Sequence, residues 1–558
     1  MQLRFTNSFT SELTADPVAD NHLRQVEGAH FSRVEPVVPS APEVVALSAE
    51  LIDQLGLGDE ADGTTHTASD AFVDLVSGRA FPDGADPYAM VYGGHQFGNW
   101  AGQLGDGRAI AIGEVETSDG GRRTLQLKGA GPTPYSRGAD GMAVLRSSIR
   151  EFLCSEAMHH LGVPTTRALS LVVTGDKVMR DMLYDGNPAP EPGAVVCRVS
   201  PDFLRFGNFQ LPAARGDDEG LRALVAYTIR HHFGHLLDDG TSDLGRGVLE
   251  PDDLTADLII AWFTEVIERT ADLMVEWMRV GFVHGVMNTD NLSILGETID
   301  YGPYGWQDDY DPDWTPNTTD RAHRRYRFGQ QPMVAHWNLA QLGNALVGLL
   351  DETDQPRLQA AFDTFPDRYR NGYRTMMAAK LGLSDHPALD DVADDDDRAD
   401  LDELIVALDQ VLRLTETDMT LFFRLLADLP AGTQARSDRD LVAPIVDAYY
   451  APDELTGTTL AAVTTWLRRY LDELAEAGTP DDERRAATHA VNPLYVLRNF
   501  QAQLAIDAAE TGDFSVVRQL LDVLRRPYTE QPGADRFAEK RPDWARTRAG
   551  CSMLSCSS

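Results

Sequence analysis

The alternation of hydrophobic and polar positions separates a strand-rich part of the chain from a helical part. Four segments between residues 88 and 210 have the short pattern of β-strands: Arg108 to Val115, Arg123 to Lys128, Met179 to Leu183 and Ala194 to Val199. From about residue 218 onward, apolar residues recur mainly at helical spacing. The pattern predicts a small sheet that precedes a large helical region.

Three longer segments are predicted to be helical. In residues 143–161 the apolar side chains fall near one face, and Gly162 ends the pattern. Leu258 to Val280 predicts a long helix that stops at Gly281. A later helical block covers residues 493–526. We expect the first of these helices to pack on the sheet.

Three other stretches lack periodicity and are expected to be irregular. Residues 386–402 are rich in aspartate and predict a solvated loop. Asp185 to Pro192 predicts an extended, exposed loop, and the final thirty residues predict a tail.

The composition is typical of a globular protein. With 558 residues and 43% hydrophobic content, the chain can bury a large core divided between two or more lobes. No apolar run approaches the roughly 18 residues of a membrane span. The first residues, Met-Gln-Leu-Arg-Phe-Thr-Asn, lack the layout of a signal peptide. We therefore expect a cytoplasmic protein with no membrane partner.

The charge balance is strongly acidic, with a net charge of −38. Non-specific nucleic-acid binding needs a basic surface, so nucleic acid is not an expected partner. The simplest interpretation is a solvated acidic shell. Only four of the 49 basic residues are lysines, namely Lys128, Lys177, Lys380 and Lys540. A chain that prefers arginine so consistently has a reason for each lysine, which directs attention to Lys128.

The four cysteines, Cys154, Cys197, Cys551 and Cys556, are too few for a disulfide framework and wrongly spaced for a zinc site. Cys154 and Cys197 lie within predicted elements and are expected to be core residues. Cys551 and Cys556 lie in the last eight residues, where we expect no packing role.

The segment from His284 to Gly302 resembles the catalytic and metal loop of a protein kinase. Kinases have H-R-D-x-x-x-x-N followed by D-F-G. Here Asn291 takes the place of the kinase asparagine, and Asp300-Tyr-Gly takes the place of D-F-G. Val286 occupies the position of the catalytic aspartate, so the usual base for phosphorylation is missing.

Other residues of this loop have chemistry suited to a nucleotide site. Asn291 and Asp300 offer hard oxygen ligands for Mg²⁺ or Mn²⁺. Asp290 directly precedes Asn291 and could accept a proton from an attacking hydroxyl group. His284 is expected to organise the loop through hydrogen bonds.

Two features of the strand-rich part fit the same site. Gly105 and Gly107 flank a turn before Arg108, where backbone N–H groups could approach phosphate, although a structural turn is an equal alternative. Lys128 ends a predicted strand on the side opposite its leucines, and Glu151 follows on the predicted helix. A strand lysine paired with a helix glutamate is how kinases hold ATP phosphates.

Arg198 and Arg205 are two further cations in an aromatic, otherwise charge-poor segment, Cys-Arg-Val-Ser-Pro-Asp-Phe-Leu-Arg-Phe. In this setting they are candidates to bind an anion.

The order of the elements predicts an α+β, protein-kinase-like bilobal fold with additional C-terminal helices. We expect four parts: an N-terminal extension (1–87), a strand-rich nucleotide-binding N-lobe (88–215), a helical C-lobe that carries the catalytic and metal loop (216–480), and a C-terminal helical segment with a cysteine-containing tail (481–558).

Several long motifs resemble those of the SelO family of pseudokinases, also called YdiU or UPF0061. The matching segments extend over nearly the whole chain: Tyr92 to Gly98, Leu127 to Arg137, Asp140-Gly141, His284 to Asn291, Ile299 to Pro303, Gln331-Pro332, Trp337 to Leu339, Asn492-Pro493, Leu497 to Asn499 and Ser555 to Ser558.

The resemblance implies a protein adenylyltransferase, which transfers AMP from ATP to Ser, Thr or Tyr hydroxyl groups of proteins. It implies an ATP bound in an orientation flipped relative to kinases. It implies ATP contacts from Gly105, Gly107, Arg108, Lys128, Asp140, Gly141, Arg198, Arg205 and Asp300. Asp290 would be the proton acceptor, Asn291 and Asp300 the metal ligands, and Glu151 the partner of Lys128. We expect a monomer.

The family is understood to use a C-terminal cysteine or selenocysteine in redox control, paired with a cysteine of the C-lobe. This chain has no cysteine between residues 198 and 550. The remaining candidates are a Cys551–Cys556 pair or an intermolecular disulfide of Cys556.

Two other functions remain open from the sequence. The first is a conventional kinase that transfers the γ-phosphate, against which Val286 weighs. The second is a non-catalytic ATP-binding scaffold with a redox-active tail.

Overall fold

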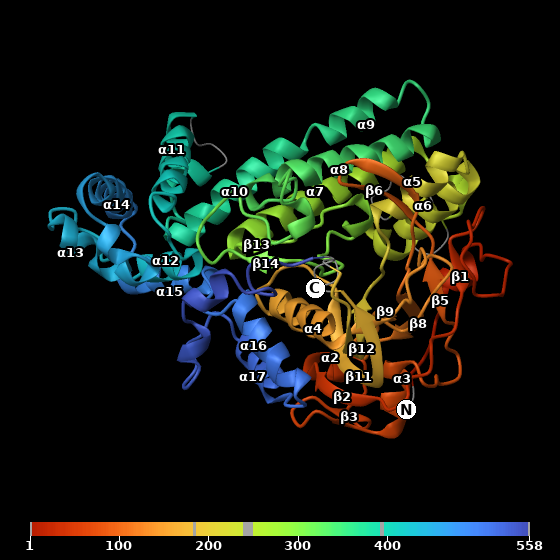
Figure 1. The fold of residues 1–558 in the computed structure, drawn as a ribbon. Helices are drawn as coiled ribbons and strands as arrows, with labels where there is room; N and C mark the ends of the chain where they lie inside the picture. Colours follow the sequence, from red (N-terminus) through yellow and green to blue (C-terminus); the bar gives the residue numbers. More distant parts are fainter. Residues whose placement is uncertain (1–2, 182–185, 238–248, 391–394, 556–558) are drawn as a thin grey trace.

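The fold is α+β, with an antiparallel sheet beside a larger helical region (Figure 1). The computed structural model describes residues 3–181, 186–237, 249–390 and 395–555. The sheet comes mainly from the first 200 residues and the helices mainly from the rest, as the sequence pattern predicts.

The main sheet is antiparallel throughout the described residues. Its strands lie in the order β1 (Phe31–Arg33), β5 (Tyr88–Met90), β8 (Ala109–Glu116), β9 (Arg122–Lys128), β12 (Ala189–Ser200), β11 (Arg167–Arg180) and β2 (Glu43–Leu47), with β10 (Ala143–Val144) against β12. The predicted strands at 108–115 and 123–128 are confirmed as β8 and β9. The two edge strands, β1 and β2, come from the segment expected to be an N-terminal extension, so this segment helps to build the sheet.

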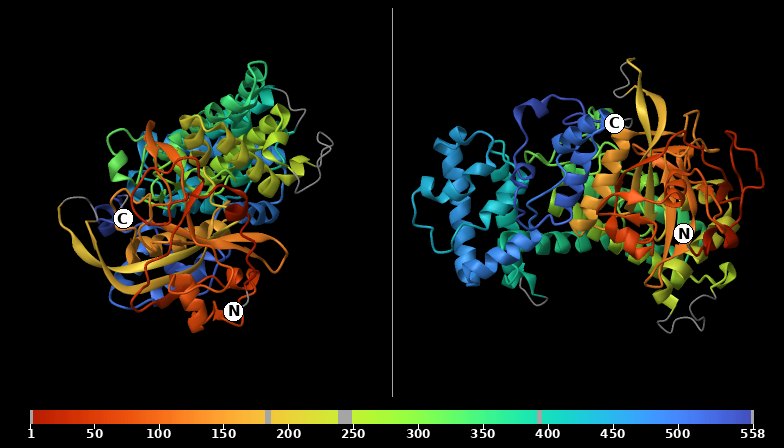
Figure 2. Two further views of the ribbon diagram at one scale, coloured as in Figure 1. Left: turned by 90° about the vertical axis from the view of Figure 1, so that its right-hand side faces the viewer. Right: turned by 90° about the horizontal axis from the view of Figure 1, so that it is seen from below.

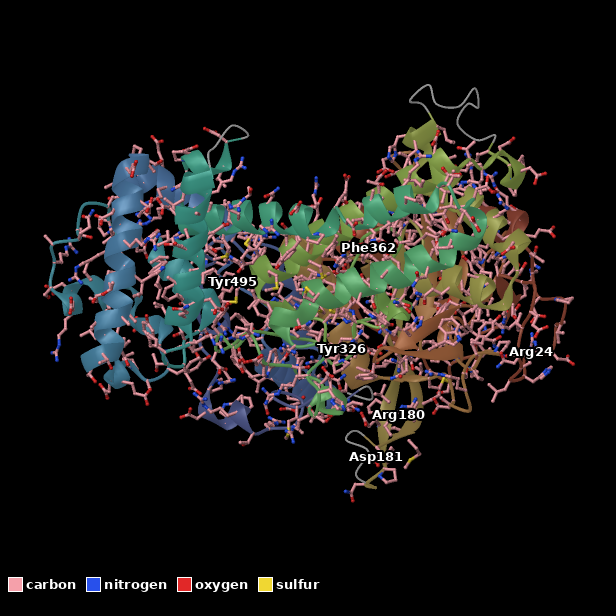
Figure 3. The ribbon with its side chains drawn as sticks, turned by 90° about the horizontal axis from the view of Figure 1, so that it is seen from above. Arg24, Arg180, Asp181, Tyr326, Phe362 and Tyr495 are labelled. Atoms are coloured by element: carbon pink, nitrogen blue, oxygen red, sulfur yellow. The ribbon has the colours of Figure 1, made fainter. Side chains whose placement is uncertain are left out.

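The strands β11 and β12 are much longer than the sequence predicts. The prediction for Ala194 to Val199 is confirmed, but that for Met179 to Leu183 covers only the end of β11, and its last residues lie outside the described part. Beyond the sheet the two strands continue as a paired arm, on which Arg180 and Asp181 lie (Figure 3).

The predicted loop at Asp185 to Pro192 is therefore wrong in its second half. Ala189 and the three residues after it belong to β12 and pair with Lys177 to Arg180. Asp185 itself lies outside the described residues. Much of this pairing is exposed on both sides, so no burial pattern marks these strands in the sequence.

The helix α4 (Leu145–His160) confirms the helix predicted at 143–161 and packs against β11 and β12. The predicted block at 493–526 is two helices, α16 (Asn499–Glu510) and α17 (Ser515–Leu524), which both pack on α4. The C-terminal part of the chain thus returns to support the helix that carries Glu151.

The helix α7 (Ala256–Val280) confirms the long helix predicted before the catalytic loop. The Thr255 side chain caps its first turn by accepting a hydrogen bond from Leu258, and Gly281 ends it at a φ of 73°, which favours glycine. It packs against α8 (Gln331–Leu346), α9 (Gln355–Phe362) and α10 (Phe365–Leu381).

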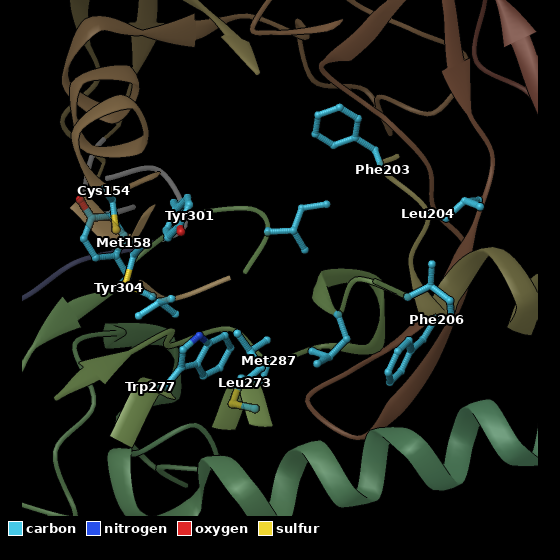
Figure 4. Close-up of a cluster of buried hydrophobic side chains, with 14 of the residues drawn as sticks. Cys154, Met158, Phe203, Leu204, Phe206, Leu273, Trp277, Met287, Tyr301 and Tyr304 are labelled. Carbon is cyan, nitrogen blue, oxygen red and sulfur yellow. The ribbon is translucent and has the colours of Figure 1, made fainter. Parts of the chain in front are cut away.

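One hydrophobic cluster joins the sheet region to the helical region. Buried side chains of α4, α7 and the 301–304 segment belong to it, including Cys154, Trp277, Tyr301 and Tyr304 (Figure 4). Because α7 and the catalytic loop share this core with α4, the loop is held at a fixed place relative to the sheet.

A second group of helices lies at the end of the molecule away from the sheet (Figure 2). It consists of α11 (Asp395–Leu412), α12 (Met419–Leu426), α13 (Asp438–Val442), α14 (Gly457–Ala477) and α15 (Asp481–Val491). A second hydrophobic cluster joins α11 to α14 with the ends of α7 and α10, and α15 packs on α10. The loop predicted at 386–402 is wrong from Asp395 onward, because α11 begins there. Its later turns bury Leu401, Leu404 and Leu408, which supply the apolar face by which the helix packs.

The remaining α-helices and strands of the described residues are short or belong to the first 310 residues. They are α1 (Ser8–Glu12), α2 (Ala49–Gln54), β3 (Ala61–Asp62), β4 (Thr67–Ala68), α3 (Asp70–Ser77), β6 (Gly93–Gln96), β7 (Asn99–Gln103), α5 (Phe206–Arg215), α6 (Asp218–His232), β13 (Phe282–Val283) and β14 (Gly305–Trp306). No helix in the described ranges has the length and apolar character needed to cross a membrane.

Candidate active site

The predicted nucleotide and metal residues line a single cavity of about 830 Å³. The lining includes Gly105, Gly107, Arg108, Lys128, Asp140, Gly141, Arg198, Arg205, Asp290, Asn291 and Asp300. Residues of the sheet and its turns form one side, and the 286–303 segment forms the other. Glu151 is not part of the lining but lies behind Lys128, where the kinase-like ion pair was expected.

Asp300 lies at the centre of a buried ion-pair network. Its Oδ1 is 2.6 Å from an Arg198 nitrogen and 3.4 Å from Lys128 Nζ, and its Oδ2 is paired with Arg205. Burial opposes ionisation, but the cations Arg205, Lys128 and Arg198 prevail and hold the Asp300 pKa well below its usual value. Asp300 is therefore a carboxylate surrounded by three cations.

Glu151 completes this network from α4. It lies 2.7 Å from Lys128 Nζ and 3.2 Å from an Arg198 nitrogen. The sheet explains why these cations meet: Arg198 on β12 is directly opposite Gln126 on β9, and Lys128 lies two residues along the same face. The Gln126 side chain is also hydrogen-bonded to Arg198, which fixes the guanidinium group.

Asp106 is a buried acid of this site that is not among the residues predicted from the sequence. It lies between the two glycines, accepts a hydrogen bond from the Met90 backbone N–H at 3.1 Å, and is 3.5 Å from an Arg205 nitrogen. Burial raises its pKa, and Arg205 opposes this. The only available signal was its position between Gly105 and Gly107.

The two glycines are required by packing. A Cβ atom on Gly105 would lie 2.5 Å from the Tyr135 ring, and its φ is 139°; a Cβ on Gly107 would lie 2.9 Å from the Tyr135 carbonyl oxygen. The structural turn that the sequence left open is therefore present, and it brings the segment around Tyr135 against the cavity wall.

The catalytic loop is organised by His284, as predicted. The buried imidazole accepts a hydrogen bond from the Val286 N–H at Nδ1 (3.3 Å), so Nε2–H donates to the Ile299 carbonyl at 2.9 Å. This bond connects the start of the loop to the residue before Asp300. Asn291 donates its amide N–H to the Val286 carbonyl at 2.9 Å, which leaves its Oδ1 without a partner in the described part of the chain.

Asp290 is almost completely buried beside Asn291. Its Oδ2 accepts a hydrogen bond from Gln96 Nε2 at 3.1 Å, whereas its buried Oδ1 has no partner within the described residues. Burial raises the Asp290 pKa to about 6, despite the lowering effect of Gln96. A carboxylate with a pKa in this range is suited to act as a general base near neutral pH.

Comparison with known proteins identifies the family. A family model described as "Protein adenylyltransferase SelO" matches residues 20–525. The chain belongs to the SelO family. A curated relative from Rhodopirellula baltica, named "Protein nucleotidyltransferase YdiU", is 55% identical over 563 residues, covering 100% of this chain and 99% of the relative. Relatives with the same name from Azoarcus sp. and Xanthomonas axonopodis pv. citri are 55% and 54% identical, each over 100% of this chain and 99% of their own length.

Among solved structures, ROP2 from Toxoplasma gondii, titled "a virulence factor with a protein-kinase fold and no enzymatic activity", covers 62% of this chain and 91% of its own. The TM-score is 0.25 at 10% identity, too low to support any inference. The kinase-like character of this SelO-family chain follows instead from its own lobes and from the Lys128–Glu151 and Asn291–Asp300 arrangement.

The oxygen donors of this SelO-family site fit a divalent cation. The free Asn291 Oδ1 and the ionised Asp300 carboxylate are both hard ligands. Another acidic group, formed by Glu50, Glu156 and His160, does not fit a metal. Its carboxylates are already paired with Arg525 and Arg167.

The cysteines give no redox pair within the described residues. Cys154, Cys197 and Cys551 are free thiols, and Cys556 lies outside the described part. The expectation that packing does not explain Cys551 is wrong. Its side chain is buried beside Phe500 and Ala545, and its carbonyl accepts a hydrogen bond from Asn499 at 2.9 Å. Burial raises the pKa of the Cys551 thiol to about 11, so it is not a reactive thiolate at neutral pH.

A second unusual carboxyl group lies between Asn291 and Asp300. Ser200 Oγ is 2.6 Å from the Asp202 carbonyl oxygen and 2.7 Å from Glu297 Oε2. A protonated Glu297 would donate to Ser200 Oγ while the hydroxyl group donates to Asp202, so that each contact has its own proton. In agreement, burial raises the Glu297 pKa to about 7, against the lowering effect of Ser200.

We expect the variant Glu297→Gln to stabilise the protein at pH 8 by about 1 to 2 kcal/mol. Its raised pKa means that Glu297 favours folding only while protonated, and the penalty grows as pH rises from the unfolded value toward 7. Glutamine stays neutral and can still donate to Ser200. Thermal melting should therefore show a gain that is larger at pH 8 than at pH 5.5, whereas the exposed control Glu403→Gln shows none. An equal gain at both pH values would contradict a protonated Glu297.

Proposed function

We propose that this chain transfers AMP from ATP to hydroxyl groups of Ser, Thr or Tyr side chains in proteins and releases diphosphate. The observation that carries the proposal is the placement of Asp290. This buried carboxylate lies in the nucleotide cavity next to Asn291, while Val286 occupies the position of the kinase base. Membership in the SelO family and the names of its relatives support the same activity.

In the proposed reaction, the acceptor hydroxyl oxygen attacks the α-phosphorus of ATP. Its proton passes to the Asp290 carboxylate, and the bond from the α-phosphorus to the diphosphate oxygen breaks. Negative charge then develops on the leaving diphosphate. Lys128, Arg198 and Arg205 form a fixed cationic group in the cavity wall and would stabilise that charge.

Arg205 connects this cationic group to the proposed base. One of its nitrogens donates to the Asp290 backbone carbonyl at 2.8 Å and is also paired with Asp300. The base and the cations are therefore held in one rigid arrangement, which lowers the entropic cost of reaching the reactive geometry.

Asn291 and Asp300 are the proposed ligands of a divalent cation, Mg²⁺ or Mn²⁺. When bound, such an ion would add positive charge next to the phosphates. Asp300 now has both oxygens engaged by cations, so the nucleotide phosphates would have to take over some of these partners. Arg108, Asp140 and Gly141 lie farther along the same cavity lining and are proposed nucleotide contacts.

The proposal predicts transfer of label from α-labelled ATP, but not from γ-labelled ATP, to the chain itself or to proteins of a lysate. The reason is that only the AMP group stays with the acceptor. Parallel reactions with Mg²⁺ and with Mn²⁺, each with an EDTA control, would also show which ion supports transfer. Label from γ-labelled ATP alone would instead identify a kinase, and ATP binding without either label a non-catalytic scaffold.

A further inference from the structure

The β6–β7 hairpin lies directly against the catalytic loop. Three successive residues of the hairpin contact three successive residues of the loop. The His95 N–H donates to Thr289 Oγ1 at 2.7 Å, the Phe97 N–H donates to Asn288 Oδ1 at 3.2 Å, and Gln96 Nε2 donates to Asp290 Oδ2 at 3.1 Å. The hairpin also packs on α5 and on the turn that contains Asp290 (Figure 1).

The two backbone contacts fix the strand, so the Gln96 side chain is presented to Asp290 at a set distance. Within the described residues, Gln96 provides the one side-chain hydrogen bond to this carboxylate, and Oδ1 has no partner. The Gln96 hydrogen bond therefore restrains rotation of the carboxylate through one oxygen only. Without this bond, the Asp290 carboxylate would be free to rotate away from the acceptor hydroxyl group.

Gly94 leaves space for the other oxygen, Oδ1. A Cβ atom on Gly94 would lie 2.6 Å from Asp290 Oδ1, below any normal contact distance, and 3.0 Å from Asp290 Cβ, which is tighter than most contacts. The φ of Gly94 is not in the left-handed region, so backbone freedom does not explain this glycine. What it provides is room for the Asp290 side chain to pack against the hairpin.

We propose that Gln96 is a positioning residue which, together with Gly94, fixes the carboxylate of Asp290 in the orientation that accepts the proton. Gln96 holds Oδ2 through its amide N–H, and Gly94 leaves the space that Oδ1 occupies. The inference rests on the proposed function, because it assigns Asp290 as the base. It adds that the β6–β7 hairpin orients the carboxylate of this base.

The test compares variants of the full-length chain in transfer of AMP from α-labelled ATP, with kcat, KM for ATP and equilibrium ATP affinity measured separately. Gln96→Met keeps the side-chain length but removes the donor, and should lower kcat about 10- to 100-fold while ATP affinity changes less than about twofold. Gln96→Glu keeps the shape but replaces the amide by a like charge, and should be at least as impaired. Gly94→Ala should also lower kcat, because its methyl group displaces Asp290.

The matched control is Gln103→Met, on the other strand of the same hairpin. The Gln103 side chain accepts from the Val26 N–H and from Arg215 and donates to the Arg24 carbonyl, and within the described residues it has no hydrogen bond to the loop. This variant should lose thermal stability without a comparable loss of kcat.

Several outcomes would overturn the inference. One is a normal kcat in Gln96→Met and Gly94→Ala, and another is a parallel loss of ATP affinity, which would make Gln96 a nucleotide ligand. If Gln96→Met lowers the melting temperature as much as Gln103→Met and kcat falls equally in both, the role of Gln96 is structural. Failure of the wild-type chain to transfer α-label would refute the proposed function itself, which is a different result from normal transfer by these variants.

Discussion

Replacing Asp290 by asparagine is expected to lower the rate of AMP transfer by about 10²- to 10⁴-fold, the usual contribution of a general base. Asparagine has nearly the same shape, so the loop and its contact with Gln96 should persist. What is lost is the ability to accept a proton. Because the Asp290 side chain is not part of the ion-pair network around Asp300, ATP affinity should change little.

The measurement is the initial rate of transfer from α-labelled ATP, with ATP affinity determined by calorimetry on the same preparations. Val286→Asp provides an informative comparison, since it restores a carboxylate at the kinase position. It should not rescue Asp290→Asn if the base acts from position 290. A full transfer rate in Asp290→Asn would show that another group, or water, takes the proton.

The core of the site could be predicted because its chemistry is local in sequence. The alternation along the strand predicts that Lys128 lies on the face opposite Leu125 and Leu127. The spacing within the 284–302 segment matches Asn291 and Asp300 to the metal ligands of kinases. Residue type then predicts the ligands, because amide and carboxylate oxygens bind metal ions and cationic side chains bind phosphates. The structure brings these residues into one cavity.

Other parts of the site depend on contacts between distant segments and gave no such signal. Asp106 belongs to the site because Arg205, about a hundred residues later, lies beside it. Gln96 belongs to the site because its side chain donates a hydrogen bond to Asp290, 194 residues away. A polar residue in a glycine-rich stretch predicts a turn equally well in the absence of those partners.

The use of lysine also shows that sequence features alone do not reveal which residues meet in the cavity. The rarity of lysine directs attention to Lys128, which lines the cavity, but it equally marks lysines outside the cavity, and Lys177 is simply exposed. Lys380 is buried against the Phe423 ring and donates to the Arg279 carbonyl at 2.8 Å, and Lys540 donates to the Tyr449 carbonyl at 2.6 Å. Composition therefore does not distinguish a lysine of the cavity from a lysine elsewhere, whereas the fold does.

Errors in the predicted elements have a common physical origin. The arm of β11 and β12 and residues 398–400 of α11 bury little apolar surface, so their hydrophobic periodicity is weak. The C-terminal tail is held by isolated buried side chains such as Ala545 and Leu554, and by backbone hydrogen bonds. Leu554 exchanges hydrogen bonds with Pro316 and Thr318, next to the segment that supports the catalytic loop. Backbone hydrogen bonds of this kind do not depend on side-chain type.

Replacing Asp300 by asparagine should have opposite effects on two kinds of nucleotide binding. Asp300 has a φ of 59°, a conformation that asparagine tolerates and alanine does not, so Asp300→Asn removes the charge with little backbone strain. With the metal present, we expect ATP affinity and AMP transfer to fall by about 10²-fold or more, because a charged ligand of the cation is lost.

In EDTA the same variant is expected to bind ATP at least as tightly as the wild type. The Asp300 carboxylate now competes with phosphate for Lys128, Arg198 and Arg205, and removing it leaves those cations free for the nucleotide. Calorimetric titration with and without divalent cation would measure both affinities.

The variant Glu151→Gln distinguishes the loss of a metal ligand from the loss of a negative charge in the network. It removes one negative charge from the same network without removing a proposed metal ligand, so metal-free binding should strengthen while the benefit of added metal is kept. If Asp300→Asn weakened ATP binding equally with and without metal, Asp300 would be a direct nucleotide contact or a structural anchor. A loss confined to the metal-containing titration would establish that this carboxylate pairs with cations of the protein in the free site and with the divalent cation once ATP arrives.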